Sequence, residues 1–235
     1  MVEVGFMKKP ITYGMIGSGR VARHLQHYFD LLHIPFVVWD RQTQTNVEPV
    51  MEHADVILVL IKDDAIESFL QNHPLLLQKP CIHFSGSLQI QNAQSFHPLC
   101  NFTDALYSDD FYPKIPFVVE KGRHTFSDIF PTLPNPHYEI APEHQKLYHA
   151  LCVIAGNFPT LLWQTCQNHF EKINLPKDIF YPYIENIAKQ FIQNPENALT
   201  GPFARKDSKT IASNEASLED SQLKEIYTVF KKSFL

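Results

Sequence analysis

Gly14-Met15-Ile16-Gly17-Ser18-Gly19-Arg20-Val21-Ala22 is the stretch that decides the expected fold. It joins an apolar run, 11–16, to an amphipathic segment, 21–32, and so predicts a strand, a tight turn and a helix. Gly17 permits the turn, Gly19 lets a ligand approach the backbone, and Ala22 lets the helix pack closely on the strand. The N–H groups and positive dipole end of such a helix attract phosphates. The pattern predicts dinucleotide binding through Gly17, Ser18, Gly19, Arg20 and Val21.

Arg20 adds a second argument for a bound phosphate. A cation in the first helical turn opposes the helix dipole at a cost of about 0.3–1 kcal/mol, and a nearby phosphate would reverse that sign. Three of the eight glycines of the chain also lie within residues 14–19. The alternative is a glycine turn that only joins strand to helix.

The rest of the first half alternates apolar runs with amphipathic segments. The runs 36–39, 56–61 and 81–84 predict buried strands, and 115–119 and 137–140 predict later ones, with a short helix near Phe126 between them. Asp63 or Asp64 is expected to cap a helix that starts near Ala65. Near-continuous apolar strands separated by helices indicate an α/β fold, a Rossmann-type doubly wound and mainly parallel sheet.

After Pro142 the pattern becomes helical. Residues 143–170 have helical periodicity, with a kink or break expected at Pro159. Pro176 suits the first turn of a helix that runs to Ile192, and a third helix is expected over 218–234. The chain is therefore predicted to hold two domains, a dinucleotide-binding domain over 1–142 and an all-helical domain over 143–235.

Composition narrows the class of protein. A net charge of −5 over 235 residues gives no global field that favours nucleic acid. The longest apolar run, 56–61, is too short to span a membrane, and residues 1–10 lack a cleavage signature. The four cysteines are expected to be reduced core residues, and the twelve scattered histidines predict no metal site. A cytoplasmic enzyme is expected.

The second predicted strand ends at Trp39-Asp40-Arg41, about twenty residues after the glycines. An acidic residue there typically binds the adenine ribose of NAD, whereas an arginine pairs with the 2′-phosphate of NADP. Both types are present, so Asp40 and Arg41 are expected to contact the cofactor. NADP is favoured, NAD is the alternative, and two solvated loop charges are a third reading.

Ligands of such sheets lie beyond the carboxyl ends of the strands, where three segments qualify. Ile61 would border the cofactor, and Lys62 could polarise a carbonyl, hold a carboxylate or simply be exposed. Ser85 and Gly86 could bind a substrate carboxylate or carbonyl, or form only a polar turn. His97 precedes a proline and could exchange a proton with a carbonyl or hydroxyl, or only hydrogen-bond the backbone.

The helical half supplies further candidates. His149 and Asn157 are eight residues apart, so a continuous helix would place them on roughly one face. They could orient a substrate or make interdomain hydrogen bonds. Arg205 follows a glycine–proline turn and could clamp a carboxylate bidentately, or be a surface charge.

Taken in order, these segments resemble a family of Rossmann-like oxidoreductases whose C-terminal domain was long of unknown function. The carriers are Ile16-Gly17-Ser18-Gly19-Arg20-Val21, Asp63-Asp64-Ala65-Ile66, His83-Phe84-Ser85-Gly86, His97-Pro98-Leu99, Tyr148-His149 with Asn157, and Thr200-Gly201-Pro202 with Arg205 and Asp207. The resemblance covers nearly the whole chain. Ala22 and Lys206 stand where members often have glycine.

One branch of that family looks like the alternative (PanG-type) ketopantoate reductases of pantothenate and coenzyme A synthesis. The resemblance implies NADPH-dependent reduction of 2-dehydropantoate, a small 2-oxo acid, to pantoate. It also implies a helical domain like that of 6-phosphogluconate dehydrogenase, which commonly forms dimers. Lys62 falls where ordinary ketopantoate reductases carry a functional lysine, and His97-Pro98 is similar to a substrate-binding segment of prephenate dehydrogenases.

In the resulting hypothesis, Arg205 and Ser85 hold the carboxylate, His97 or Lys62 protonates the developing alkoxide, and His149 and Asn157 orient the substrate. A dehydrogenase of an imino acid or a prephenate-like diacid is the enzymatic alternative. A nucleotide-sensing module without turnover is the alternative from another class; it needs Gly17 and Gly19 but no ordered cluster of His97, His149 and Arg205.

Overall fold

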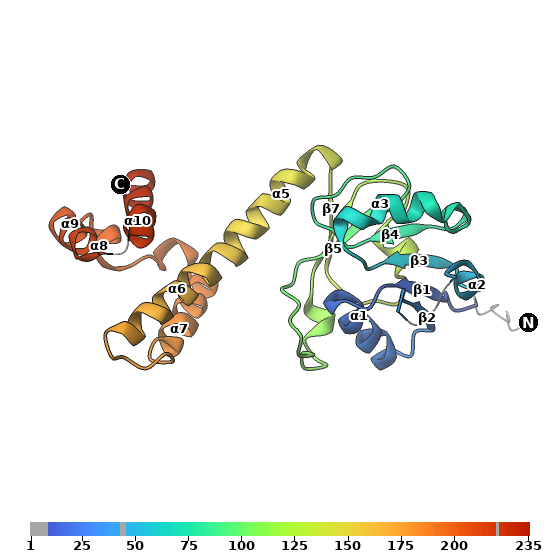
Figure 1. Cartoon of the computed structure of the whole chain (residues 1–235), viewed down its shortest axis with the longest axis horizontal. Coiled ribbons are helices and arrows are strands. Elements are labelled where there is room, and N and C mark those ends of the chain that lie inside the picture. Colours follow the sequence, from blue (N-terminus) through green and yellow to red (C-terminus); the bar gives the residue numbers. More distant parts are fainter. Residues whose placement is uncertain (1–8, 43–45, 220) are drawn as a thin grey trace, which may run out of the picture. The chain divides into compact units, whose positions relative to one another are not determined.

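The computed structural model describes residues 9–42, 46–219 and 221–235 (Figure 1). The chain divides into two compact units, Met1–Thr160 and Leu161–Leu235. The first unit contains every strand of the sheet, and the second is helical. The change from strands to helices comes at Pro142, but the helix that follows still belongs to the first unit.

The first unit is built on a seven-stranded sheet in the order β2-β1-β3-β4-β5-β6-β7. β1 to β5 are parallel, β6 is antiparallel to β5, and β7 is parallel to β6. This arrangement confirms the predicted Rossmann-type, mainly parallel α/β fold. The strands are β1 (Tyr13–Ile16), β2 (Phe36–Trp39), β3 (Val56–Val59), β4 (Cys81–His83), β5 (Gln94–Pro98), β6 (Phe117–Glu120) and β7 (His137–Ile140).

Helices cover both faces of the sheet, with α1 and α3 on opposite sides (Figure 1). Alternate strand residues bury into two separate cores: Leu58 packs with Phe29 of α1, whereas Ile57 packs with Ile66 of α3. The helical segments of the first unit are α1 (Arg20–Leu31), α2 (Glu48–Met51), α3 (Asp63–Asn72), α4 (Phe126–Ile129) and α5 (Gln145–Cys152), with 3-10 turns at Pro74–Gln78, Tyr112–Lys114 and Pro142–His144.

The sequence located most of these elements, but it did not predict the short helix α2 or the strand β5, and it assigned the wrong cap to α3. β5 was not predicted as a strand, because polar Gln94, Ser95 and His97 interrupt its apolar pattern although Gln94 and Ser95 are buried. The predicted aspartate cap of α3 is wrong: the helix begins at Asp63, and the residue at its N-cap is Lys62, which makes no side-chain capping bond.

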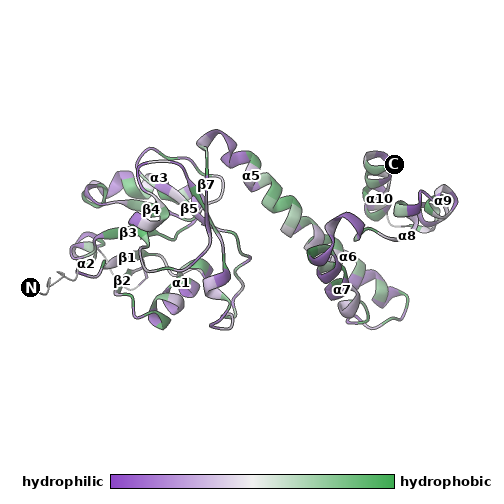
Figure 2. Cartoon of the chain, turned by 180° about the vertical axis from the view of Figure 1, so that it is seen from behind, coloured by the Kyte–Doolittle hydropathy of each residue, from purple (hydrophilic) through white to green (hydrophobic). Residues whose placement is uncertain are grey.

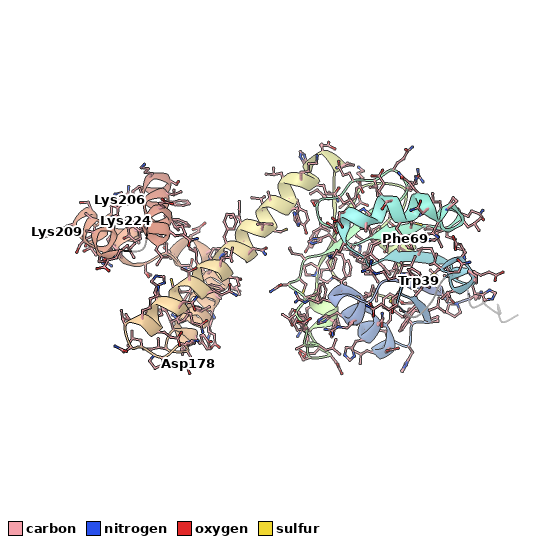
Figure 3. The ribbon with its side chains drawn as sticks, in the orientation of Figure 1. Trp39, Phe69, Asp178, Lys206, Lys209 and Lys224 are labelled. Atoms are coloured by element: carbon pink, nitrogen blue, oxygen red, sulfur yellow. The ribbon has the colours of Figure 1, made fainter. Side chains whose placement is uncertain are left out.

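Aromatic packing anchors the end of β2 against α3. Trp39 and Phe69 lie side by side (Figure 3), with ring centroids 5.7 Å apart. This contact fixes the strand end from which Asp40 and Arg41 emerge.

The later helices differ from the predicted ones in four places, one of which is the unpredicted helix α9 (Ser208–Ser217). A π-helical turn, Val153–Asn157, comes just before Pro159, where a break was expected; proline lacks the N–H that a regular helical bond requires. Helix α7 begins at Tyr181 rather than near Pro176. The predicted turn around Arg205 instead forms a short helix. The segments are α6 (Phe158–Lys172), α7 (Tyr181–Gln193), a 3-10 turn at Pro195–Asn197, α8 (Gly201–Arg205), α9 (Ser208–Ser217) and α10 (Ser221–Phe234).

Lys206 ends α8 in the left-handed conformation, with φ of 53°. Glycine adopts that conformation without steric cost, which explains the glycine that the resembling family often has there. In the described part of the chain, no helix is long and apolar enough to cross a membrane.

Candidate active site at the carboxyl ends of the strands

The glycine loop after β1 is shaped by the ends of two neighbouring strands. Gly17 has φ of 121°, and its N–H donates to the carbonyl of Trp39 at 2.8 Å. A Cβ atom at this position would lie 2.5 Å from the carbonyl oxygen of Leu60. Only glycine therefore fits, for both conformational and steric reasons.

Gly19, in contrast, faces open space. It is the N-cap residue of α1, and a Cβ atom there would meet nothing within 4 Å. No side chain caps this helix and its first turn holds no acidic residue. The first N–H groups of a helix have no intrahelical partner, so this end of α1 fits a diphosphate.

Arg20 already has a counter-charge within the chain. Its Nε donates to a carboxylate oxygen of Asp104 at 2.9 Å, and Arg23 donates to the carbonyl oxygen of the same residue. The hydrogen bond from Arg20 lowers the pKa of the Asp104 carboxyl group. Because Asp104 offsets the unfavourable dipole interaction, the presence of Arg20 is weaker evidence for a phosphate than the sequence suggested.

The remaining cofactor candidates lie around this loop. Ser18 is exposed, Val21 is partly buried in the first turn of α1, and Ile61 lies 3.2 Å from the position of a Cβ atom on Gly17. At the end of β2, Asp40 accepts the backbone N–H of Gln42 at 2.8 Å. Arg41 is exposed and makes no hydrogen bond or ion pair with the described residues.

Polar side chains meet at the carboxyl end of β4, where His83 pairs with Ser95 near the start of β5. The hydroxyl of Ser85 donates to a carboxylate oxygen of Asp63 at 2.5 Å, and the hydroxyl of Ser95 donates to the carbonyl of Ser85 at 2.6 Å. Ser85 Oγ also accepts the N–H groups of Ser87 and Leu88. The proton of the Ser85 hydroxyl is therefore engaged by Asp63, a residue that the sequence offered only as a helix cap.

His97 lies beside two residues of α5. Its Nδ1 is 2.7 Å from the hydroxyl of Tyr148, and its ring is edge-on to those of Tyr148 and His149, at centroid distances of 5.6 and 6.1 Å. Gly86 makes this approach possible: a Cβ atom there would be 2.6 Å from Cδ2 of His149 and 3.1 Å from Nε2 of His97. The structure thus brings His97, His149 and Gly86 together, as the sequence hypothesis requires.

Burial keeps His97 and Tyr148 neutral near pH 7. It lowers the pKa of His97 to about 4, with a smaller contribution from His149, while Asp63 acts in the opposite direction. Burial also raises the pKa of Tyr148, and the nearby thiol of Cys152 adds to the effect. His97 is therefore an uncharged imidazole, and Tyr148 is a protonated phenol.

His83 is a second buried imidazole that the sequence reasoning did not assign. It is 0% exposed, and neither ring nitrogen has a hydrogen-bond partner in the structure. Burial lowers its pKa to about 4, opposed by Asp63. The signal available in the sequence was a histidine within the otherwise apolar run 81–84.

Three predicted residues do not join this cluster. Lys62 is exposed, and its side chain makes no hydrogen bond or ion pair with the described residues. Asn157 is exposed on the π-helical turn. Arg205 is exposed at the end of α8, in the second unit.

One cavity lies outside the candidate site. A cavity of about 370 Å³ is lined by Cys81 and Gln94, the first residues of β4 and β5, and so opens at the opposite edge of the sheet. The four cysteines are free thiols. Among the described residues, no three His, Cys, Asp or Glu side chains are grouped to hold a metal ion.

Replacing Gly86 by alanine is expected to lower the free energy of unfolding by about 1–3 kcal/mol, because the added methyl group collides with two packed imidazole rings. The urea midpoint would measure the loss. Gly156→Ala is the matched control, since a Cβ atom there meets nothing within 4 Å. An equal midpoint for Gly86→Ala and the wild type would contradict the packing described for this turn.

The fold and site define a class: a Rossmann-type α/β protein with an open glycine loop and a set of C-terminal helices. A family model described as a domain of unknown function, DUF2520, matches residues 115–234. The match covers just over half of the chain, which therefore belongs to the DUF2520 family. No curated protein matches the chain significantly.

Solved structures share this fold at low sequence identity. A candidate NADP oxidoreductase from Bacteroides fragilis has a TM-score of 0.76 and 22% identity, over 95% of this chain and 97% of that one. A protein from Thermotoga maritima has a TM-score of 0.70 and 21% identity, over 94% and 97%. Pyrroline carboxylate reductase from Plasmodium falciparum, solved with NADP bound, has a TM-score of 0.59 and 15% identity, over 95% and 91%.

Proposed function

We propose that the chain is a cytoplasmic, NADPH-dependent oxidoreductase that reduces a small 2-oxo acid, with 2-dehydropantoate as the first substrate to test. The observation that carries the proposal is the glycine loop. At Gly17 only glycine fits, whereas at Gly19 the space before the start of α1 is open. Both residues lie at the carboxyl edge of the sheet, as does His97 near the end of β5. Such an edge is where doubly wound sheets bind ligands.

The cofactor would bind along this edge. Gly17, Ser18, Gly19, Arg20 and Val21 would hold the diphosphate, and Ile61 would border the bound cofactor. Arg41 supports NADPH over NADH because its guanidinium has no partner among the described residues. Asp40 would accept a ribose hydroxyl. When bound, the nicotinamide would supply a hydride to the substrate.

The chain's own residues would hold the substrate and supply a proton. Arg205 is the proposed partner of the carboxylate, together with Ser85 and Gly86 at the turn after β4, and Lys62 is the alternative to His97 as the proton donor. His97 would protonate the developing alkoxide. His149 and Asn157 would orient the substrate. Of these groups, His97, His149 and Gly86 are already within a few ångströms of each other.

An imino acid is the second candidate substrate. A protonated C=N bond carries a positive charge, and the carboxylate of Asp63 lies next to Ser85 at the turn. Among proteins with this fold are a pyrroline carboxylate reductase and an imine reductase from Bacillus cereus. These observations make a cyclic imino acid the natural comparison for a 2-oxo acid.

Oxidation of NADPH, followed by absorbance, tests the proposal with 2-dehydropantoate, other 2-oxo acids and 1-pyrroline-5-carboxylate, with NADH run in parallel. We expect oxidation with a 2-oxo acid and a preference for NADPH. His97→Gln should lower turnover at least about tenfold at unchanged NADPH affinity, because a positioned acid contributes roughly 10²–10⁴ in rate. Tight NADPH binding without oxidation of any substrate would favour a nucleotide-sensing module instead.

We also propose that the helical unit pairs with a second copy to form a homodimer. Among the described residues of 161–235, the buried hydrophobic residues are only Phe180 and Ile211. Large side chains such as Ile192, Leu199 and Phe234 are exposed, and hydrophobic colour runs along α10 (Figure 2). A helical unit that buries so few of its large hydrophobic side chains would bury more of them against a second copy. Light scattering would measure the mass in solution.

A further inference from the structure

We propose that Tyr148 is a positioning residue that fixes His97 as the Nε2–H tautomer and passes a proton to its Nδ1 while the substrate is reduced. This inference rests on the proposed reductase function and deepens it. Tyr148 comes from α5 and His97 from β5, 51 residues apart in the sequence, and their side chains form one hydrogen bond.

The direction of that hydrogen bond follows from the two groups. The hydroxyl of Tyr148 is 2.7 Å from Nδ1 of His97. Burial keeps the imidazole uncharged and the phenol protonated. A neutral imidazole has one N–H and one basic lone pair, and a phenol is the better donor while the imidazole nitrogen is the better acceptor. The phenol therefore donates to Nδ1, and the ring proton lies on Nε2.

The Nε2 atom of His97 faces the turn after β4, where we propose that the substrate binds. It is 3.1 Å from the position of a Cβ atom on Gly86, and Cδ2 of His149 is 2.6 Å from the same position. The N–H of His97 thus points to the turn after β4, at the carboxyl edge of the sheet. Asp63 and His149 are the other titratable groups near His97, and Cys152 lies beside Tyr148.

Both ring nitrogens of His97 must take part in the proton transfers if the ring is to stay neutral. When bound, the nicotinamide would supply a hydride to the carbonyl carbon, and the C=O bonding pair would move to the oxygen. That oxygen takes the proton of Nε2 as the Nε2–H bond breaks. Without a second transfer, His97 would become an imidazolate anion in a buried site, which is costly. Nδ1 therefore takes the phenol proton, and solvent restores the proton to the Tyr148 phenolate.

Nitrogen-15 NMR of the histidine rings tests the tautomer in the wild type and in Tyr148→Phe, without any ligand. We expect His97 as Nε2–H in the wild type and a mixture of tautomers in Tyr148→Phe. Tyr138→Phe is the matched control, because Tyr138 is 64% exposed on β7 and has no part in the proposed proton transfer. An Nδ1–H tautomer in the wild type would overturn the proposal, whether or not the variant folds.

Turnover gives the second readout. For Tyr148→Phe we expect kcat to fall roughly 10- to 100-fold, with the Kd of NADPH within about twofold, because the loss concerns proton supply rather than binding. The solvent deuterium isotope effect on kcat should increase. Unchanged kcat and isotope effect would overturn the proton-transfer role. If the wild type reduces no substrate, the reductase proposal fails, and the NMR result alone then decides the positioning role.

Discussion

Replacing Gly19 by aspartate is expected to weaken NADPH binding at least about 100-fold, equivalent to about 2.7 kcal/mol, and at the same time to stabilise the protein without cofactor. Gly19 is an N-cap with extended backbone angles that any residue adopts, and a side chain there meets no atom of the chain. An aspartate would cap α1 and interact favourably with its dipole, together worth about 0.5–1 kcal/mol.

The same carboxylate would occupy the N–H groups that a diphosphate needs, and would repel its charge. Opposite changes in stability and in affinity are therefore the signature of an anion site at this helix end. Calorimetric titration with NADPH and thermal unfolding of the free protein measure the two effects. Gly19→Asn is the control, because it caps the helix without adding a charge and should weaken binding less. NADPH affinity equal to that of the wild type in Gly19→Asp would remove the cofactor site from the glycine loop.

The free energy of unfolding is expected to fall by several kcal/mol between pH 7 and pH 4. Burial lowers the pKa values of His83 and His97 to about 4 in the folded protein, from the ordinary histidine value of 6.5. Between these two values the unfolded chain binds protons that the native chain does not, so stability decreases as the pH falls. A fully buried ring such as His83 contributes up to about 3 kcal/mol, and the partly buried His97 contributes less.

Urea unfolding at pH 7, 5.5 and 4.5 measures this dependence, and His83→Leu isolates one of the two groups. The substitution removes a buried ring whose nitrogens have no hydrogen-bond partner, so it should leave stability at pH 7 nearly unchanged or raise it. It should also flatten the pH dependence. His53→Gln is the control, since His53 is exposed. An equally steep dependence in His83→Leu and in the wild type would show that the burial of His83 is not its cause.

Some features of the fold can be predicted from the sequence alone, and others cannot. Gly17 could be read directly, because a strand, a glycine turn and a helix follow each other along the chain. The steric reason for Gly17, the Leu60 carbonyl 2.5 Å away, required the neighbouring strand to be in place. β5 could not be read from its pattern, because its buried Gln94 and Ser95 are polar.

In the candidate site, too, some residues are predictable from the sequence and others are not. Residue type and position predicted His97, His149 and Gly86 as site residues, and the structure places the three side by side. The role of Asp63 as the acceptor of Ser85 and the bond between Tyr148 and His97 join residues 22 and 51 positions apart, and no local pattern encodes them. From the sequence alone, Arg20 is taken as a sign of a bound phosphate, but in the structure its charge is paired with Asp104, 84 residues away.

The sequence by itself determined most of the order of strands and helices, with β5, α2 and α9 as the exceptions, and it determined the glycine loop and the type of chemistry available at the strand ends. These properties depend on the backbone preferences and hydrophobic period of neighbouring residues. Only the tertiary structure decided which polar groups are buried, which are paired and therefore which are neutral near pH 7. Burial and pairing arise from contacts between elements far apart in the chain, and it is the resulting loss of water around His83, His97 and Tyr148 that sets their protonation.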